Sequence, residues 1–307
     1  MNALINNNEL MKQVEKELTS AKSIMSDKTL MTWFADDFAI RFCWSSNAIE
    51  GNTLSLEETV ALVERDEVSV GHTYTEHQEA RNLYRAIQAS MIPFRTNPIS
   101  EEWIKNNNRM IYGSDGEYRK VPRAVGNLVE TTYIPPAPER VPGLMQTYVS
   151  QVNFEVDSFD DLIEKVVRSH LHFERIHPFF DGNGRTGRMI MNQQLINHGL
   201  LPVAINKNSE YRQSFKRYDK NGDISQLVHV VLAEELQSIQ RLHEFKKKRD
   251  LELPLDFNYT IDDSVKKGAS AMSMGDWREL IAKEREKSER GYEAYEKNRN
   301  SKGERER

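Results

Sequence analysis

The segment "HPFFDGNGRTGR", residues 177–188, gathers side chains that could act on a phosphate ester. Its three glycines let backbone N–H groups approach an anion closely. A helix that begins within the segment would add the positive end of its dipole to that attraction. The segment therefore predicts a phosphate-binding loop at a helix N-terminus.

The other polar residues of the segment suit phosphoryl-transfer chemistry. His177 titrates near neutrality and could accept a proton from an attacking hydroxyl group. Asp181 is a hard oxygen ligand suited to Mg²⁺, which takes one or two carboxylates and completes its shell with water and phosphate oxygens. Arg185 and Arg188 lie three positions apart, so they are neighbours on a helix and offer forked donors to phosphate.

A glycine-rich loop that only caps a helix, with a core histidine and surface arginines, is the simpler alternative. We favour a functional site because a base, a metal ligand and an anion site all fall in one loop. The chain contains neither GxxxxGK[S/T] nor a GxGxxG that follows a strand, so the other common nucleotide-binding patterns do not explain the segment.

These residues resemble the defining motif of the Fic family, HxFx(D/E)GNGRxxR, at every specified position. The likeness extends over about residues 30–240, because "HLHFERIHPF", the proline-rich region before it and "GHTYTEHQEARNLYRAI" are also similar to family members. It implies an all-α fold, a Fic-type helical domain with a small β-hairpin flap beside the active site. It also implies a protein adenylyltransferase, which moves AMP from ATP to a Ser, Thr or Tyr hydroxyl of a target protein with Mg²⁺.

The resemblance implies a role for each matching residue. His177 would be the base that acts on the target hydroxyl, and Asp181 would hold Mg²⁺ against the α- and β-phosphates. Arg188 would hold the γ-phosphate. The anion site would comprise Gly182, Asn183, Gly184 and Arg185.

Gly184 bears on which group is transferred. Doc-type members of the family, which phosphorylate their targets, carry lysine at this position, where it would occupy space that the Fic anion site leaves for phosphate. The glycine therefore favours AMP transfer. Transfer of UMP, phosphocholine or another phosphate-containing group by the same fold stays open.

A second motif, "SNAIEG" at residues 46–51, is similar to the family's inhibitory motif (S/T)xxxE(G/N). Ser46 and Glu50 are four residues apart and share a helix face, and Glu50 stands at the carbonyl end, where a negative charge is unfavourable unless a cation meets it. A solvated charge at a helix end is the simpler alternative. The resemblance instead implies an inhibitory helix over about 29–51, with Glu50 paired to Arg188. A carboxylate at this place could also orient a water molecule that removes AMP from a modified target.

The chain divides into three regions. Residues 1–98 are expected to be an N-terminal helical region that includes the inhibitory helix. Residues 99–245 are expected to be the catalytic core, with the flap at about 116–134. Residues 246–307 are a highly charged C-terminal tail, expected to be a solvated helix or disordered.

Apolar spacing and capping residues predict most of the chain to be helical. The expected helices cover residues 9–25, 29–50, 55–66, 75–91, 100–113, 158–174, 184–198, 208–218 and 223–246. Between 114 and 142, prolines and β-forming residues predict a short hairpin and an extended connection instead.

The composition narrows the class of protein and of partner. At 38% hydrophobic and 29% charged residues the chain is globular, and its net charge of −5 gives no general attraction for nucleic acid. Without an 18-residue apolar run or a signal segment, we expect no membrane association and a cytoplasmic location. A target protein would dock on the flap hairpin by strand addition. A homo-oligomer, a non-catalytic regulator that only senses ATP and a DNA-associated regulator stay open.

Overall fold

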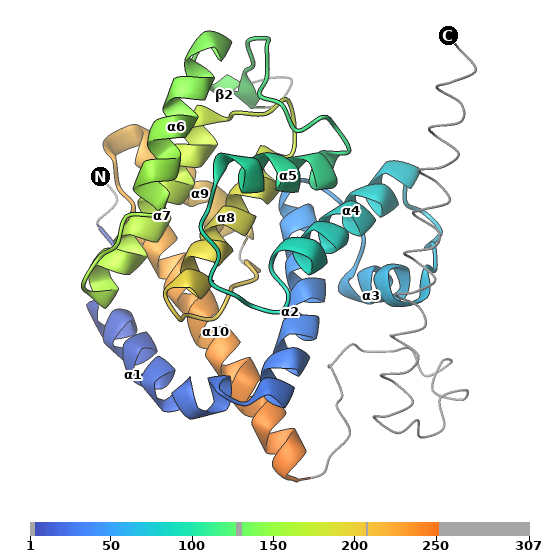
Figure 1. Ribbon diagram of the computed structural model, residues 1–307, viewed down its shortest axis with the longest axis vertical. Coiled ribbons are helices and arrows are strands. Elements are labelled where there is room, and N and C mark those ends of the chain that lie inside the picture. The colour runs from blue at the N-terminus through green and yellow to red at the C-terminus, as the bar shows by residue number, and fades with distance from the viewer. Residues whose placement is uncertain (1–3, 127–130, 207, 252–307) are drawn as a thin grey trace.

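The computed structural model describes residues 4–126, 131–206 and 208–251, and most of these residues are helical (Figure 1). This confirms the helical class predicted from the sequence. None of the helices in these ranges is both long and apolar enough to cross a membrane. The helices are α1 (Asn8–Met25), α2 (Lys28–Ile49), α3 (Leu56–Arg65), α4 (Tyr74–Ser90), α5 (Glu101–Tyr112), the 3₁₀ turn η1 (Pro138–Arg140), α6 (Val141–Val152), α7 (Phe159–Ile176), α8 (Asn183–Asn197), α9 (Asn208–Asn221) and α10 (Ser225–Asp250).

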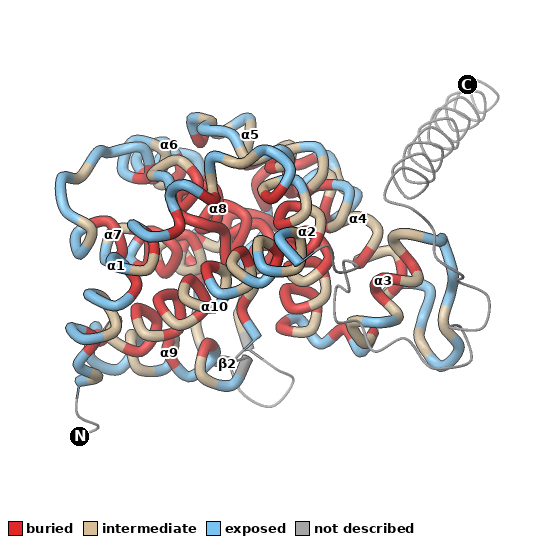
Figure 2. Tube along the Cα trace, turned by 90° about the horizontal axis from the view of Figure 1, so that it is seen from below, coloured by how far each residue is buried: buried red, intermediate tan, exposed pale blue. Residues whose placement is uncertain are grey.

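Helix α8 lies at the centre of the molecule and packs against α2, α5 and α7 (Figure 1). Every residue from 185 to 196 is buried, and Figure 2 shows α8 within the buried interior. Buried charged groups are costly unless they are paired. The two arginines at the start of α8 must therefore find partners inside the protein.

Several helix ends follow from local side-chain chemistry. The Ser55 hydroxyl accepts a hydrogen bond from Glu58 N, and the Glu58 carboxylate accepts one from Ser55 N, so α3 begins with a capping box. The Ser100 hydroxyl caps α5 in the same position, and Gly113 ends that helix in the left-handed conformation. These ends confirm the sequence prediction.

The sequence pattern does not predict helix α6. This helix begins at the end of the segment 114–142, which was expected to be extended, and continues beyond it. Pro142 stands in the first turn, where a missing N–H breaks no helical hydrogen bond. The helix buries Met145 and Tyr148 in a small apolar cluster together with Phe173 and Phe179. Tertiary packing therefore outweighs the extended tendency of this proline-rich stretch.

The strand content is small. Strands β1 (Val125–Gly126) and β2 (Thr131–Tyr133) pair in antiparallel fashion with an irregular register. The residues between them, 127–130, lie outside the described part of the chain, as does the predicted tail beyond residue 251. So short a pair does not establish a hairpin flap over 116–134, and the flap stays a prediction.

Candidate active site

The loop between α7 and α8, residues 177–182, is tight at both ends. His177 ends α7 with left-handed backbone (φ 49°) and donates its N–H to the Phe173 carbonyl at 2.9 Å. Such a conformation costs a non-glycine residue about 1–3 kcal/mol. Gly182, at φ 75°, leads into α8 from the other end. The fold therefore holds the histidine at a fixed, strained turn.

Side chains from α8, from α5 and from the loop itself hold this loop in place. Asn183 accepts a hydrogen bond from Phe179 N at 2.8 Å and donates to Phe179 O at 3.0 Å. Asn108, on α5, donates to the Asp181 carbonyl at 2.9 Å and to the Thr186 hydroxyl at 3.2 Å. The ring of Phe179 is 1% exposed and packs under α6. The amide of Asn183 thus shapes the loop, whereas its predicted part in anion binding stays untested.

The first turn of α8 carries no side chain at Gly184, and the carboxylate of Glu50 lies against it. A Cβ atom at Gly184 would overlap Glu50 Oε1 and would lie 3.1 Å from Arg188 Nη1. The backbone N–H groups of a helix N-terminus attract anions. The structure therefore places the Glu50 carboxylate where the sequence predicts the anion site.

Arg188 is 1% exposed, and all three nitrogens of its guanidinium donate to acceptors within the protein. Its Nη2 lies 2.6 Å from Glu50 Oε1 and also donates to the Ser46 carbonyl at 2.9 Å. Its Nε donates to Ser46 Oγ at 2.8 Å, and its Nη1 donates to the Tyr211 hydroxyl at 3.4 Å. The ion pair expected between Glu50 and Arg188 is present, and Ser46 takes part in it.

Two arginines offset the unfavourable position of the Glu50 carboxylate at the carbonyl end of α2. Arg188 meets the Ser46 carbonyl, and Arg212 of α9 donates to the Ile49 carbonyl. Burial acts to raise the pKa of the Glu50 carboxyl, but the positive charges of Arg188, Arg185 and Arg212 outweigh burial and hold this pKa below its ordinary value. Glu50 is therefore ionised at neutral pH.

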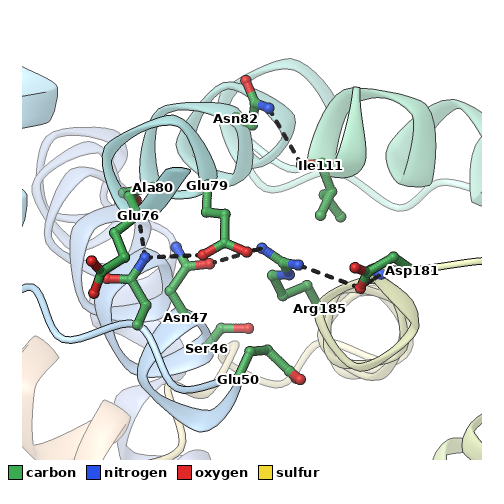
Figure 3. Close-up of polar contacts among 12 residues, drawn as sticks. Ser46, Asn47, Glu50, Glu76, Glu79, Ala80, Asn82, Ile111, Asp181 and Arg185 are labelled. Carbon is green, nitrogen blue, oxygen red and sulfur yellow. Dashed lines mark hydrogen bonds and ion pairs between the residues drawn. The ribbon is translucent and has the colours of Figure 1, made fainter. Parts of the chain in front are cut away.

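Arg185 points away from Glu50 toward α4 (Figure 3). Its Nη1 lies 3.0 Å from Glu79 Oε1 and 3.4 Å from Asn47 Oδ1, and its Nη2 lies 3.8 Å from Asp181 Oδ1. The side chain is only 4% exposed. The two motif arginines thus pair with different glutamates.

His177 is uncharged at neutral pH. Burial is the main cause that lowers its pKa, to about 4, and the charges of Arg119 and Arg123 act in the same direction. A hydrogen bond with the Glu174 backbone and the charge of Glu50 oppose this shift. A neutral imidazole can accept a proton, which is the state that a general base needs.

Arg119 connects the loop to the segments beside it. This buried side chain donates from Nε to the His177 carbonyl at 2.8 Å and from Nη2 to the Pro136 carbonyl at 2.5 Å. It also donates to the carbonyls of Val121 and Ile176. The ends of the predicted flap are therefore tied to the residue expected to act as base.

Sequence reasoning missed the partners that hold the motif. The Tyr211 hydroxyl accepts from Arg188 Nη1 and lies 2.7 Å from His170 Nε2, so it links these two side chains. Glu79 lies in the segment "GHTYTEHQEARNLYRAI", which is similar to family members but contains no motif that marks its glutamates. Arg119 and Asn108 carry no local signal, because their partners lie 58 and 73 positions away.

Asp181 suits Mg²⁺ by its chemistry and its exposure. Its side chain is 51% exposed beside the N-terminus of α8, so an ion could reach it together with phosphate oxygens. Within the described residues, His, Cys, Asp and Glu form no group of three or more that could hold a metal by itself. One carboxylate fits a cation whose remaining ligands come from a nucleotide and water.

Known proteins are similar to this chain in sequence and in fold. Residues 98–195 match the family model described as the Fic/DOC family. Protein adenylyltransferase fic-1 of Caenorhabditis briggsae is 31% identical over 210 residues, which cover 65% of this chain and 40% of the relative. Protein adenylyltransferase Fic of Nematostella vectensis is 28% identical over 233 residues, which cover 73% of this chain and 53% of the relative. The chain thus spans about half, or less, of the length of these relatives.

Two solved structures have the same fold. A Fic domain containing signaling protein from Bacteroides thetaiotaomicron superposes with a TM-score of 0.67 at 24% identity, covering 78% of this chain and 97% of that chain. Fic-1 from C. elegans superposes with a TM-score of 0.65 at 26% identity, covering 78% of this chain and 72% of that chain. The Fic-type helical fold expected from the sequence is confirmed.

Proposed function

We propose that this chain, which carries a Fic domain of the Fic/DOC family, is a protein adenylyltransferase that uses ATP. The names of its curated relatives support this activity. The observation that carries the proposal is the convergence on one loop of a neutral histidine, an exposed aspartate and a bare helix N-terminus flanked by two arginines.

The reaction follows from these groups. The oxygen of a Ser, Thr or Tyr hydroxyl attacks the α-phosphorus of ATP, and His177 takes the hydroxyl proton. The bond between the α-phosphorus and the bridging oxygen breaks, and pyrophosphate leaves with the electron pair. Placement and charge neutralisation dominate such transfers. Mg²⁺ held by Asp181 would supply part of that neutralisation.

The other residues of the loop have binding roles in this proposal. The N–H groups at Gly182, Asn183 and Gly184 and the guanidinium of Arg185 receive the phosphates. Arg188 takes the γ-phosphate once Glu50 has moved. A target segment adds as a strand beside β2, where main-chain hydrogen bonds give affinity. A cytoplasmic location remains part of the proposal.

Autoinhibition by Glu50 belongs to the same proposal. The carboxylate lies against Gly184 and holds Nη2 of Arg188, so it competes with phosphate for both. ATP can then bind only with its phosphates displaced from in-line attack. Ser46 fixes the guanidinium through its hydroxyl and carbonyl oxygens.

The test is transfer of label from ATP by the E50G protein in a lysate with Mg²⁺, followed by mass spectrometry of the labelled bands. The E50G/H177A protein is the control for chemistry at the histidine. Labelled bands that require His177 support the proposal, whereas label retained in E50G/H177A contradicts its role as base. ATP binding without any transfer would favour a regulator that only senses ATP.

Removal of AMP by the same site is a second candidate. It is favoured by the ionised Glu50 carboxylate beside the phosphate cradle, where it could orient an attacking water molecule. Purified AMP-modified target is incubated with wild type and with E50G, and loss of AMP is followed by intact mass. Release by wild type and not by E50G supports the activity, and no release by either protein contradicts it.

A further inference from the structure

Glu79, on α4, is the carboxylate that pairs with Arg185. Its Oε1 lies 3.0 Å from Arg185 Nη1, on the side of the guanidinium opposite Asp181 (Figure 3). The Arg185 Nη2 faces Asp181 at 3.8 Å. One buried guanidinium therefore joins α4, in the N-terminal region, to the candidate metal ligand.

We propose that Glu79 is a positioning residue, which holds one end of the Arg185 guanidinium so that the other end faces Asp181 and the nucleotide phosphates. This inference rests on the proposed function and deepens it, because it names a group that acts through Arg185 without touching the nucleotide. Sequence motifs assign Glu79 no part in the site.

The shape of the guanidinium is the physical reason. The group is planar with donors at fixed angles, so fixing Nη1 also fixes the direction of Nη2. Asn47 Oδ1 adds a second acceptor at 3.4 Å on the same end. Because Arg185 is only 4% exposed, loss of its carboxylate would leave a buried charge poorly compensated.

Glu79 is itself held in place. Its Oε2 accepts a hydrogen bond from Asn52 Nδ2 at 3.2 Å, and the same Nδ2 donates to the Glu76 carbonyl at 2.9 Å. Asn52 follows Glu50 by two residues. The Glu79 carboxylate that holds Arg185 is thus fixed, through Asn52, to the residues that follow the inhibitory helix. Glu79 takes no part in the Glu50–Arg188 contact that activation must break.

The experiment compares ATP affinity in the E50G background, measured by calorimetry with Mg²⁺, for E50G, E50G/E79Q, E50G/R185A and E50G/E79Q/R185A. We expect E79Q to weaken ATP binding by about tenfold or more, as for loss of a charge-assisted hydrogen bond. In the R185A background E79Q should change the affinity less than about twofold, because the group through which it acts is gone. A merely structural role would weaken binding equally in both backgrounds.

The control is E50G/E164Q, which breaks an exposed Glu–Arg pair on α7, between Glu164 and Arg168, and should leave ATP affinity unchanged. If E79Q does not fold, E79D replaces it in the experiment. This substitution keeps the charge but moves the carboxylate away from Arg185. The ATP affinity should therefore fall when Arg185 is present and should not change in the R185A background. Unchanged affinity in E79Q or E79D, or an equal loss with and without Arg185, overturns the inference. An E50G protein that binds ATP but transfers nothing refutes AMP transfer alone, and one that does not bind ATP refutes both proposals.

Discussion

Glu50 and Arg188, 138 positions apart in sequence, form an ion pair of 2.6 Å beside Gly184 at the N-terminus of α8. Both the arginine and the bare helix end attract anions. One carboxylate therefore accepts from Arg188 and also lies against the N-terminus of α8. In the proposed function, inhibition would be a competition between Glu50 and phosphate for these groups.

Replacement of Glu50 by glycine should raise automodification by about tenfold or more, because ATP gains charge-assisted hydrogen bonds that Glu50 otherwise occupies. Intact mass after incubation with ATP and Mg²⁺ measures the added AMP. E50Q keeps the volume of the side chain and loses its charge, so it should fall between wild type and E50G. An unchanged rate in a folded E50G protein would contradict inhibition by this residue.

The activity of E50G should stay flat from about pH 8 to pH 6. An ordinary histidine, with a pKa near 6.5, would lose about three-quarters of its base form between pH 8 and pH 6. The pKa of His177 is lowered to about 4, mainly by burial, so its neutral form persists until the pH falls toward that value. Initial rates of AMP incorporation across this range provide the measurement. A rate that halves near pH 6.5 would contradict the assignment of His177 as a buried neutral base.

The same lowered pKa has a consequence for stability. Between about pH 6.5 and 4 the unfolded chain binds a proton at His177 that the folded protein does not. The free energy of unfolding should therefore fall as the pH drops through this window. Urea unfolding of wild type and H177A tests the sign: the wild type should lose more stability than H177A between pH 6.5 and 4.5. An equal loss in both proteins would contradict it.

A methyl group at Gly184 should lower AMP transfer even in the E50G protein, where Glu50 no longer inhibits. The Cβ of G184A would overlap Glu50 Oε1 and crowd Arg188, which disfavours their contact. It would also fill the place of a phosphate oxygen. We therefore expect E50G/G184A to lose AMP transfer by about tenfold or more relative to E50G, since a positioned donor set of this kind contributes that much. Full activity in the double variant would show that the reaction does not use the helix N-terminus at Gly184 as a phosphate site.

Much of the site could be predicted because its groups are close in sequence. His177, Asp181 and Arg188 fall within one loop and the first two turns of the helix that follows it. Glu50 could be matched to Arg188 only through a second motif and the unfavourable charge at its helix end. The helix caps at Ser55 and Ser100 were predictable for the same reason, since their partners lie three residues away.

The remaining features depend on contacts between distant segments. Glu79 meets Arg185 because α2, α4 and α8 converge, and no spacing in the sequence encodes that convergence. Helix α6 contains a proline and a glycine in its first turn, so propensity argues against it, yet burial of Tyr148 and Phe179 stabilises it. Local patterns carry no information about such packing.

Replacement of Arg119 tests whether the loop must be tied to the segments beside it. R119Q removes donors to the carbonyls of His177, Pro136, Val121 and Ile176, and leaves buried acceptors unsatisfied. We expect a loss of about 1–3 kcal/mol in the free energy of unfolding, or about 2–4 °C in Tm for each kcal/mol.

AMP transfer by E50G/R119Q should fall by more than this loss of stability explains, because the His177 turn is strained and Arg119 holds its carbonyl. Assays well below Tm separate the two effects, since the protein is then almost fully folded. The matched control is R168Q, which replaces the exposed partner of Glu164 and should change neither Tm nor AMP transfer. A lower Tm with unchanged transfer would mean that Arg119 stabilises the fold alone, and that His177 keeps its position without it.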